Sequence, residues 1–380
     1  MRRLRWIPIA CGALAVLLTV ATMIPSLRPA GWSLTVLPRV DSGTGMGDAA
    51  RAIDPGFRTI HPSAYDGQFY WGVAVDPIAT GDVHQYFDTA RYRYGHPLYG
   101  WLGWLFSAGQ ARAAPYALAV VSLAAMLLAA VGASLLGRTT GRDGWDGLFV
   151  AVNPGLLYAG AHTLAEPVCA ALLVGGMLAY VRGRLPAALA CFALLPLSKE
   201  PLILVPLAVA AWGLVRRRIR IHEAALLAAT ALPAIVWWTY ARIHLGAWFT
   251  SGESTTFSAP LGGWKRALID AGVNSYSSDG NQNQLGEVTV IVIVALAGLL
   301  LIASLLALRL RGPVEAAFLP LAGLMAFLGV AATANQRDIL RVTSVLIVLV
   351  PFVIASPAVL PLRRGGSARA SRSPAGRPEP

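Results

Sequence analysis

The chain is poor in charge and has very little cysteine. Only 13% of its 380 residues are charged and 56% are hydrophobic, whereas an ordinary soluble domain carries roughly 25% charged residues. This balance excludes a simple soluble enzyme. The cysteines, Cys11, Cys169 and Cys191, lie inside apolar segments without CxxC spacing, which excludes a disulfide framework and a thiolate metal site.

Sequence patterns that bind metals or nucleic acids are also missing. The histidines never form an HExxH motif and no Asp-x-Asp pair occurs, so we expect no obligatory metal site and no other cofactor. The net charge of +12 would suit a nucleic-acid-binding protein. However, the arginines stand in short clusters between apolar segments and not on one face with aromatic partners. No nucleic-acid partner is therefore expected.

Long apolar segments are abundant, and lengths of about 18 to 24 residues suit a lipid bilayer better than a soluble core. A few segments are shorter and interrupted by proline, which membrane helices tolerate when neighbours satisfy the freed carbonyl. We therefore predict an all-α polytopic membrane protein with about ten transmembrane helices. The predicted crossings are residues 6–25, 114–136, 145–160, 164–181, 185–198, 201–215, 223–243, 286–308, 313–332 and 340–361.

Clusters of basic residues predict how these helices are oriented. With the N-terminus in the cytoplasm, ten crossings place every cluster on the cytoplasmic side, as the positive-inside rule requires. The clusters are Arg2/Arg3/Arg5, Arg138/Arg142, Arg182/Arg184, Arg216–Arg220, Arg309/Arg311 and the arginines of the tail. Both termini of this multi-pass plasma-membrane protein are then cytoplasmic. The first segment could instead be a signal peptide, although no clean cleavage site follows it.

This topology gives one membrane domain, residues 1–362, followed by a basic tail at 363–380. The tail cannot bury enough apolar surface to fold, so we predict that it is disordered in the cytoplasm. Two long loops, 26–97 and 244–285, face outwards. Residues 97–110 are apolar and aromatic but too short to cross a bilayer, which predicts an interfacial helix.

Ionisable residues at the ends of the predicted helices collect on the external side. They are Glu166, Lys199, Glu200 and Arg337. Charges near membrane depth usually mark a transport path or a binding site. Each of them alone could be an ordinary interfacial cap, because long charged side chains at helix ends readily reach water. Lys199 fits that explanation least, since it directly precedes Glu200 between two proline-broken segments.

The first external loop contains the strongest candidate for catalysis. It carries the stretch Tyr65-Asp66-Gly67-Gln68-Phe69-Tyr70-Trp71. Aromatic neighbours can pack on a sugar-like face while the carboxylate stays able to accept a proton, which suits a general base. We therefore predict Asp66 as the base and Tyr65, Gln68 and Tyr70 as substrate-binding residues. Alternatively, Asp66 is a turn residue, because Asp-Gly is a common turn pair.

A second stretch of the same loop, Arg91-Tyr92-Arg93-Tyr94, combines arginines with tyrosines. Guanidinium groups offer forked donors that match phosphate oxygens, and the tyrosines would hold them at an interface. We therefore predict that Arg91, Arg93 and Tyr94 bind substrate. Together with the predicted base and the bilayer, they indicate a substrate linked to a phospholipid-like carrier.

At these residues the chain resembles the polytopic glycosyltransferases of the GT-C superfamily, including bacterial membrane proteins assigned to cell-surface glycopolymer formation. The resemblance covers roughly residues 60–205. It rests on Tyr65–Tyr70, Tyr92-Arg93-Tyr94 with His96–Tyr99, Asn153-Pro154 with Glu166-Pro167, and Lys199-Glu200-Pro201. It implies a donor sugar on a polyprenyl phosphate and an acidic catalytic base in the first external loop. Carried over, that base is Asp66, or else Asp41, which lies closer to the first helix.

The resemblance thus implies an integral membrane glycosyltransferase. It would transfer a sugar from a polyprenyl-phosphate donor to a cell-envelope glycan or glycolipid acceptor on the extracytoplasmic side, with inversion and without a metal. A cation would stabilise the departing lipid phosphate, the candidates being Arg91, Arg93, Lys199 and Arg337. Two alternatives stay open: a transporter or polymerase of lipid-linked glycans, and a non-catalytic assembly component of a surface-glycopolymer machine.

Overall fold

The computed structural model describes residues 5–61, 65–250, 257–275, 284–333 and 335–354. Within these residues the chain is built from helices and contains no β-strand beyond isolated bridges. The prediction of an all-α protein is confirmed. A helix pairs its backbone groups within one segment, which is what an apolar environment demands of a chain this rich in hydrophobic residues.

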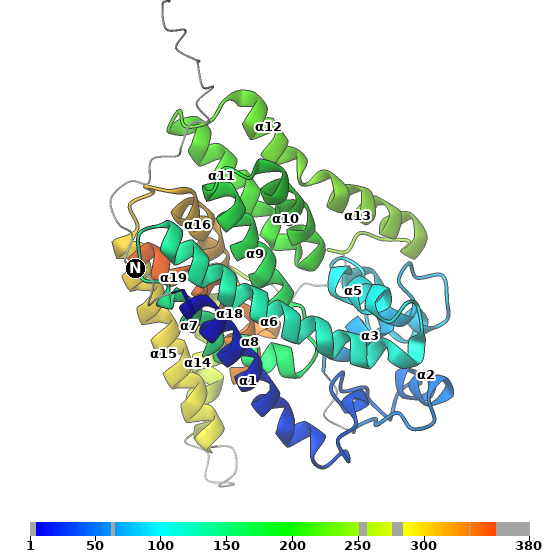
Figure 1. Ribbon diagram of the computed structural model, residues 1–380. Helices are drawn as coiled ribbons and strands as arrows, with labels where there is room; N and C mark the ends of the chain where they lie inside the picture. The colour runs from blue at the N-terminus through cyan, green and yellow to red at the C-terminus, as the bar shows by residue number, and fades with distance from the viewer. Residues whose placement is uncertain (1–4, 62–64, 251–256, 276–283, 334, 355–380) are drawn as a thin grey trace, which may run out of the picture.

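The helices follow one another along the whole described chain (Figure 1). They are α1 Ile7–Leu27, α2 Gly45–Ile53, α3 Gly67–Val75, α4 Ala90–Arg93, α5 Leu98–Phe106, α6 Ala114–Thr139, α7 Leu148–Ala151, α8 Pro154–Ala161, α9 Glu166–Val181, α10 Leu185–Ser198, α11 Leu204–Val215, α12 Ile221–Ala229, α13 Leu232–Leu245, α14 Gly262–Ser275, α15 Gln284–Ala307, α16 Pro313–Ala326, α17 Val330–Thr333, α18 Gln336–Ile347 and α19 Val350–Ile354. Proline stands in the first turn of many of them, where its missing N–H removes no helical hydrogen bond.

Several helices are able to cross a membrane, as predicted. Four are long and apolar enough: Ile7–Leu27, Ala111–Thr139, Ile221–Leu245 and Val288–Ala307. Shorter apolar helices of 10–17 residues are Glu166–Val181, Leu185–Ser198, Glu200–Val215 and Pro313–Ala326. The chain therefore has helices with the length and composition to cross a membrane, whereas membrane insertion, ten crossings and their orientation remain predictions.

Several of the predicted crossings are divided between two or more helical elements, among them 145–160, 201–215, 223–243, 313–332 and 340–361. Residues 145–160 are divided into a 3-10 turn, α7 and α8, with the break at Asn153. The backbone of Asn153 is extended there, because the residue before a proline is kept out of the helical region. The segment predicted at 340–361 belongs to α18 and α19, and its last residues lie outside the described part of the chain.

The predicted first external loop, 26–97, contains the short helices α2, α3 and α4. The helices α2 and α3 lie beside α5 at one end of the molecule (Figure 1), where α3 packs on α5 and α5 packs on α6. Seven of the nine residues of α3 are buried, so this helix is an apolar core element. Residues 97–110 contain α5, which leaves Leu105 and Phe106 exposed; its contact with a bilayer remains a prediction.

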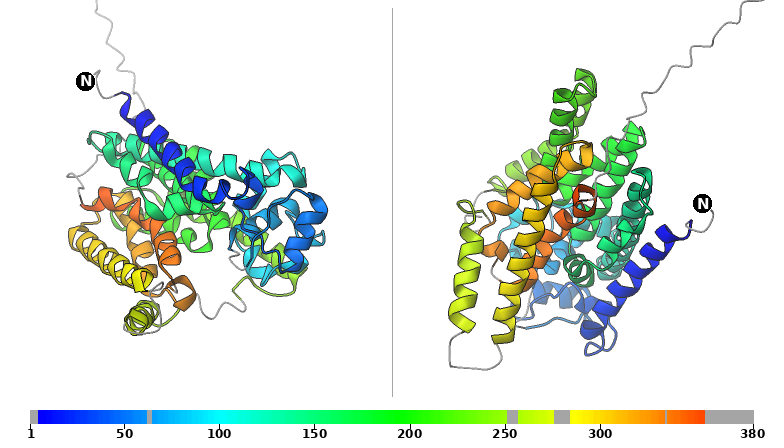
Figure 2. Two further views of the ribbon diagram at one scale, coloured as in Figure 1. Left: turned by 90° about the horizontal axis from the view of Figure 1, so that it is seen from below. Right: turned by 90° about the vertical axis from the view of Figure 1, so that its left-hand side faces the viewer.

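The region 244–285, which we predict as the second external loop, contains a helix that the sequence pattern did not indicate. Helix α14 occupies Gly262–Ser275 and lies alongside α15 (Figure 2). Its polar composition gives no hydropathy signal, yet Ala267 and Ala271 are buried against neighbouring helices, so tertiary packing stabilises it. The predicted tail at 363–380 lies outside the described residues.

The contact between α8 and α18 fixes the helix that completes the site described below. The Asn153 side chain accepts hydrogen bonds at the start of α8, and its Nδ2 donates to the Ser344 carbonyl of α18 at 3.0 Å. Gly155 permits this approach, because a Cβ there would lie 2.0 Å from the Leu340 carbonyl oxygen. The two helices are thereby held together at backbone distance.

Candidate functional site

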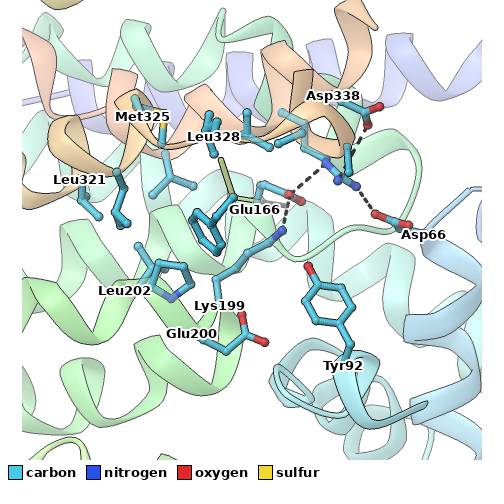
Figure 3. A pocket seen from close by; sticks show the side chains of 18 of the residues that line it. Asp66, Tyr92, Glu166, Lys199, Glu200, Leu202, Leu321, Met325, Leu328 and Asp338 are labelled. Atoms are coloured by element: carbon cyan, nitrogen blue, oxygen red, sulfur yellow. Dashed lines mark hydrogen bonds and ion pairs between the residues drawn. The ribbon is translucent and has the colours of Figure 1, made fainter. Parts of the chain in front are cut away.

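Five charged side chains from distant parts of the sequence meet in one place. Asp66 stands directly before α3, and Arg93 is the last residue of α4. Glu166 begins α9, Lys199 follows α10, and Arg341 lies in α18. Figure 3 shows Asp66, Glu166 and Lys199 around a shared space, connected by ion pairs.

These side chains line a cavity of about 410 Å³ that has a charged end and an apolar wall. The charged end holds Asp66, Arg93, Glu166, Lys199, Glu200, Asp338 and Arg341, with Tyr65 and Tyr92. The apolar wall comes from the 3-10 turn Glu200–Ile203, from α16 and the residues that follow it, and from α18, and it includes Leu202, Leu321, Leu324, Met325, Leu328, Val342, Val345 and Leu346. Figure 3 shows Leu321, Met325 and Leu328 on the side away from Asp66. The cavity thus combines charged groups of both signs at one end with an apolar surface at the other.

Asp66 is bound by a guanidinium group on each carboxylate oxygen. Arg93 Nη1 donates to Oδ1 at 3.1 Å, and Arg341 Nη1 donates to Oδ2. The side chain is 26% exposed. Burial raises the pKa of this carboxyl, but the attraction of Arg341 and Arg93 is stronger and holds the pKa below its ordinary range. Asp66 is therefore ionised at neutral pH.

The Asp-Gly pair meets two separate needs. A Cβ at Gly67 would lie 2.4 Å from the His162 carbonyl oxygen, so only glycine allows this close approach. The Asp66 side chain makes no capping hydrogen bond to α3. The turn explanation thus accounts for the glycine, whereas the aspartate side chain belongs to the charged end of the cavity.

Arg93 is held firmly by groups besides Asp66. Its Nε and Nη2 donate to the two oxygens of Asp88 at 3.0 and 2.7 Å, a forked geometry that fixes the guanidinium plane. The guanidinium carbon also lies 3.9 Å from the centre of the Phe69 ring. Arg93 is a fixed cation at the rim of the cavity.

Glu166 is a buried carboxylate between two cations. Its side chain is 2% exposed and lies 3.1 Å from Lys199 Nζ and 3.5 Å from Arg341 Nε. Within the described residues neither Glu166 oxygen accepts a hydrogen bond of good geometry, and Arg341 Nε donates none. The group is placed at the first turn of α9, where the helix dipole favours a negative charge.

Lys199 reaches the cavity because the helix before it stops. Its backbone is extended (φ −158°, ψ 124°) between α10 and the 3-10 turn Glu200–Ile203. Burial lowers the pKa of the Lys199 ammonium, but its neighbours, chiefly the Glu166 carboxylate, together hold the pKa above its ordinary value. In Figure 3 the Tyr92 hydroxyl points toward the space between Lys199 and Asp66. Lys199 therefore presents a charged donor to the cavity.

Glu200 pairs with His96, whereas the preceding residue, Lys199, pairs with Glu166. His96 Nδ1 lies 2.7 Å from Glu200 Oε1. Burial raises the pKa of this carboxyl, and the interaction with His96 lowers it to below its usual value. The pair joins the start of α5 to the break after α10, so it both lines the cavity and ties two of its walls together.

Of the residues predicted from the sequence, six line the cavity: Tyr65, Asp66, Arg93, Glu166, Lys199 and Glu200. The other five do not line it. Gln68 accepts a weak hydrogen bond from the Asp41 backbone at 3.3 Å. Tyr70 is buried beside Tyr99, and Tyr94 is buried with its hydroxyl donating to the Asp76 carbonyl.

The remaining two predicted residues are arginines. Arg91 is half-buried on α4 and is not among the lining residues. Arg337 is exposed at the start of α18 and interacts with Tyr158 and Arg39. Neither is in position to touch a molecule held between Asp66 and Lys199 without rearrangement.

Asp41, the alternative base, also lies outside the cavity lining. Its Oδ1 accepts a hydrogen bond from the Gly43 backbone at 2.9 Å and lies 2.9 Å from His61 Nδ1. The Gly43 N–H and then His61 lower the pKa of this carboxyl. The geometry is that of a loop-stabilising aspartate.

Arg341 and Asp338 are cavity residues that the sequence analysis did not select. They lie one turn apart on α18, and Tyr65 donates a hydrogen bond from its hydroxyl to Asp338 at 2.5 Å. A signal was present, because an arginine inside a predicted crossing is by default a functional candidate. Arg341 lies inside the predicted crossing 340–361 and was therefore read as part of that apolar segment.

Among the described residues, no three His, Cys, Asp or Glu side chains are grouped in a way that could hold a metal ion. No protein-family model, curated protein or solved structure matches the chain significantly. Function has to be inferred from the site itself.

Proposed function

We propose that the chain is an integral membrane glycosyltransferase of the extracytoplasmic side. It transfers a sugar from a polyprenyl-phosphate donor to a cell-envelope glycan or glycolipid acceptor, with inversion at the anomeric carbon and without a metal. The proposal includes ten crossings and cytoplasmic termini, which follow from the basic clusters.

The observation that carries the proposal is the shared cavity. A carboxylate, Asp66, lies in it with the cations Arg93, Lys199 and Arg341, and an apolar wall continues from them. A lipid phosphate needs cations at its head and an apolar surface for its chain, and a sugar acceptor needs a base. The cavity supplies all three within one space.

The residues take separate roles in the proposed reaction. The acceptor hydroxyl oxygen attacks the anomeric carbon and forms the new glycosidic bond, while Asp66 takes its proton. The bond from the anomeric carbon to the phosphate oxygen breaks, and the lipid phosphate leaves with the electron pair. Lys199 and Arg341 neutralise the charge that develops on it.

The experiment is mass spectrometry of surface glycans and lipid-linked sugars in cells that carry either the wild type or Asp66→Asn. A positioned base contributes about 10²–10⁴-fold, so we expect the variant to lose one sugar from the polymer and to accumulate the lipid donor. Asp82→Asn, a change at an exposed external carboxylate, is the matched control and retains transfer. Near-normal transfer by Asp66→Asn at equal protein level contradicts the proposal.

A further inference from the structure

Both carboxylate oxygens of Asp66 are occupied by arginines in the observed arrangement, which is incompatible with its proposed role as a base. A general base must offer an oxygen to the acceptor hydroxyl, yet Arg93 occupies Oδ1 and Arg341 occupies Oδ2. Two guanidinium groups also make the carboxylate a weak base. One of these contacts has to loosen before Asp66 can take a proton.

The two arginines are anchored very differently. Arg93 has two further hydrogen bonds to Asp88 and lies on the Phe69 ring. Arg341 makes no hydrogen bond besides the one to Asp66 within the described chain, and its nearest approach to Asp338 is 3.8 Å. Arg341 also lies 5.3 Å from the centre of the Tyr65 ring and 3.5 Å from Glu166, but of the two arginines it has fewer hydrogen bonds to break when it leaves Asp66.

A second position for Arg341 is already prepared. Its buried Nε has no hydrogen-bond acceptor and lies 3.5 Å from Oε1 of Glu166, a buried carboxylate that accepts no hydrogen bond within the described residues and has Lys199 Nζ 3.1 Å from the same oxygen. A hydrogen bond from Nε to Glu166 would give both buried groups a partner, so Glu166 offers Arg341 a second position that the present one leaves unused.

We propose that Arg341 moves between two positions: on Asp66 while the cavity lacks donor, and on Glu166 and the donor phosphate once donor is bound. The phosphate competes with Asp66 for the same guanidinium group, and donor binding thereby uncovers Oδ2 of Asp66 for the acceptor hydroxyl. The acceptor is then bound productively only after the donor. This switch rests on the proposed function and specifies how its base is controlled.

The test measures binding of an unreactive lipid phosphodiester, farnesyl methyl phosphate, to the purified full-length protein in lipid nanodiscs by calorimetry. A diester carries one charge at all working pH values, as the proposed donor does. If Arg341 spends nine-tenths of its time on Asp66, removing that competitor strengthens binding about tenfold. We expect this gain for Asp66→Asn, and also for Asp66→Ala as an independent variant.

Two further variants distinguish competition between Asp66 and the phosphate for Arg341 from a general change in the electrostatic field of the cavity. In an Arg341→Gln background, Asp66→Asn should bring no gain, because the contested cation is absent. Glu200→Gln removes another cavity carboxylate that pairs with His96, so it should strengthen binding by much less than Asp66→Asn. Equal gains from Glu200→Gln, or a gain that persists with Arg341→Gln, overturn the switch.

The outcomes also distinguish the switch from the function on which it depends. If wild type and variants bind the diester but Asp66→Asn binds no more tightly, the switch is wrong and the proposed function stands. If neither wild type nor any variant binds a lipid phosphodiester, both fail.

Discussion

At the scale of single residues, the cavity is governed by how each charge is paired. Glu200 is satisfied by His96 and Asp88 by Arg93, so these carboxylates have fixed roles. Asp66 and Glu166 share Arg341, and neither has it to itself. A cation shared by two carboxylates can move toward a ligand. When it leaves one carboxylate it keeps its interaction with the other, and this limits the free-energy cost of the move.

The pairing of Asp66 predicts a pH-dependent effect on stability. The pKa of folded Asp66 is below its ordinary value, so its ion pairs stabilise the fold above about pH 4 and are lost as pH falls through the lower folded-state pKa. Asp66→Asn should reduce the Tm by a few degrees at pH 7.

Melting curves followed by circular dichroism from pH 8 to pH 3 measure this difference. The gap between wild type and variant should be constant near neutrality and begin to narrow below about pH 4. Asp82→Asn, at an exposed position, should show no such pH-dependent gap. A gap that widens below pH 4 contradicts the assignment of Asp66 as the ionised partner.

At the scale of helices, the site is assembled where short helices begin and end. Glu166 begins α9 and Lys199 follows α10, and proline in or near each boundary stops the helix there. A charged side chain at the end of a helix can reach the cavity. No unpaired charge then has to lie among the apolar side chains inside the helix bundle. Helix α18 is different, because Arg341 projects from its middle and depends on packing against α8.

This dependence predicts a strong effect of Gly155→Ala. The new Cβ would lie 2.0 Å from the Leu340 carbonyl oxygen, so α8 and α18 must separate, at a cost of about 1–3 kcal/mol. Arg341 would move with its helix, and we expect transfer activity to fall at least about tenfold.

The matched control is Gly298→Ala in α15, where a Cβ meets nothing within 4 Å. This change should leave the Tm equal or slightly higher, because alanine favours helix over glycine by about 1 kcal/mol. Thermal stability and transfer activity are measured for both variants in the same membrane preparation. Wild-type activity in Gly155→Ala would show that the α8–α18 contact does not position Arg341.

At the scale of the whole molecule, charge and hydropathy divide the chain between membrane and water. Helices of 20 to 29 residues are able to cross, and the arginine clusters predict which ends stay in the cytoplasm. On this topology the cavity opens toward the external side. The first loop contributes Tyr65 and Asp66 beside α3, and Tyr92 and Arg93 of α4, to the cavity lining, and α3 and α5 pack against α6.

The topology predicts opposite accessibility for two exposed positions. In a variant in which Cys11, Cys169 and Cys191 are replaced by alanine, Asp82→Cys should react with a membrane-impermeant maleimide in intact cells. Arg218→Cys should react only after the cells are opened. Labelling is read by mass shift, and labelling of both positions in intact cells contradicts the predicted orientation.

Sequence alone determined the helical class, the apolar segments and six of the cavity residues. These are local properties: hydropathy over about 20 residues predicts a crossing, and proline marks where a helix stops. Asp66, Glu166 and Lys199 could be selected because charges beside apolar segments are costly unless they are used.

Only the tertiary structure decided which of the candidates face one another. Tyr94 is next to Arg93 in sequence but points elsewhere, because successive residues of a helix are turned by about 100°. Tyr70 follows Asp66 by four residues, yet it packs against Tyr99 and His96. Arg341 lies 275 residues from Asp66 and is nevertheless its partner. No local pattern encodes that contact, since it depends on how α18 packs against α8 after both have formed.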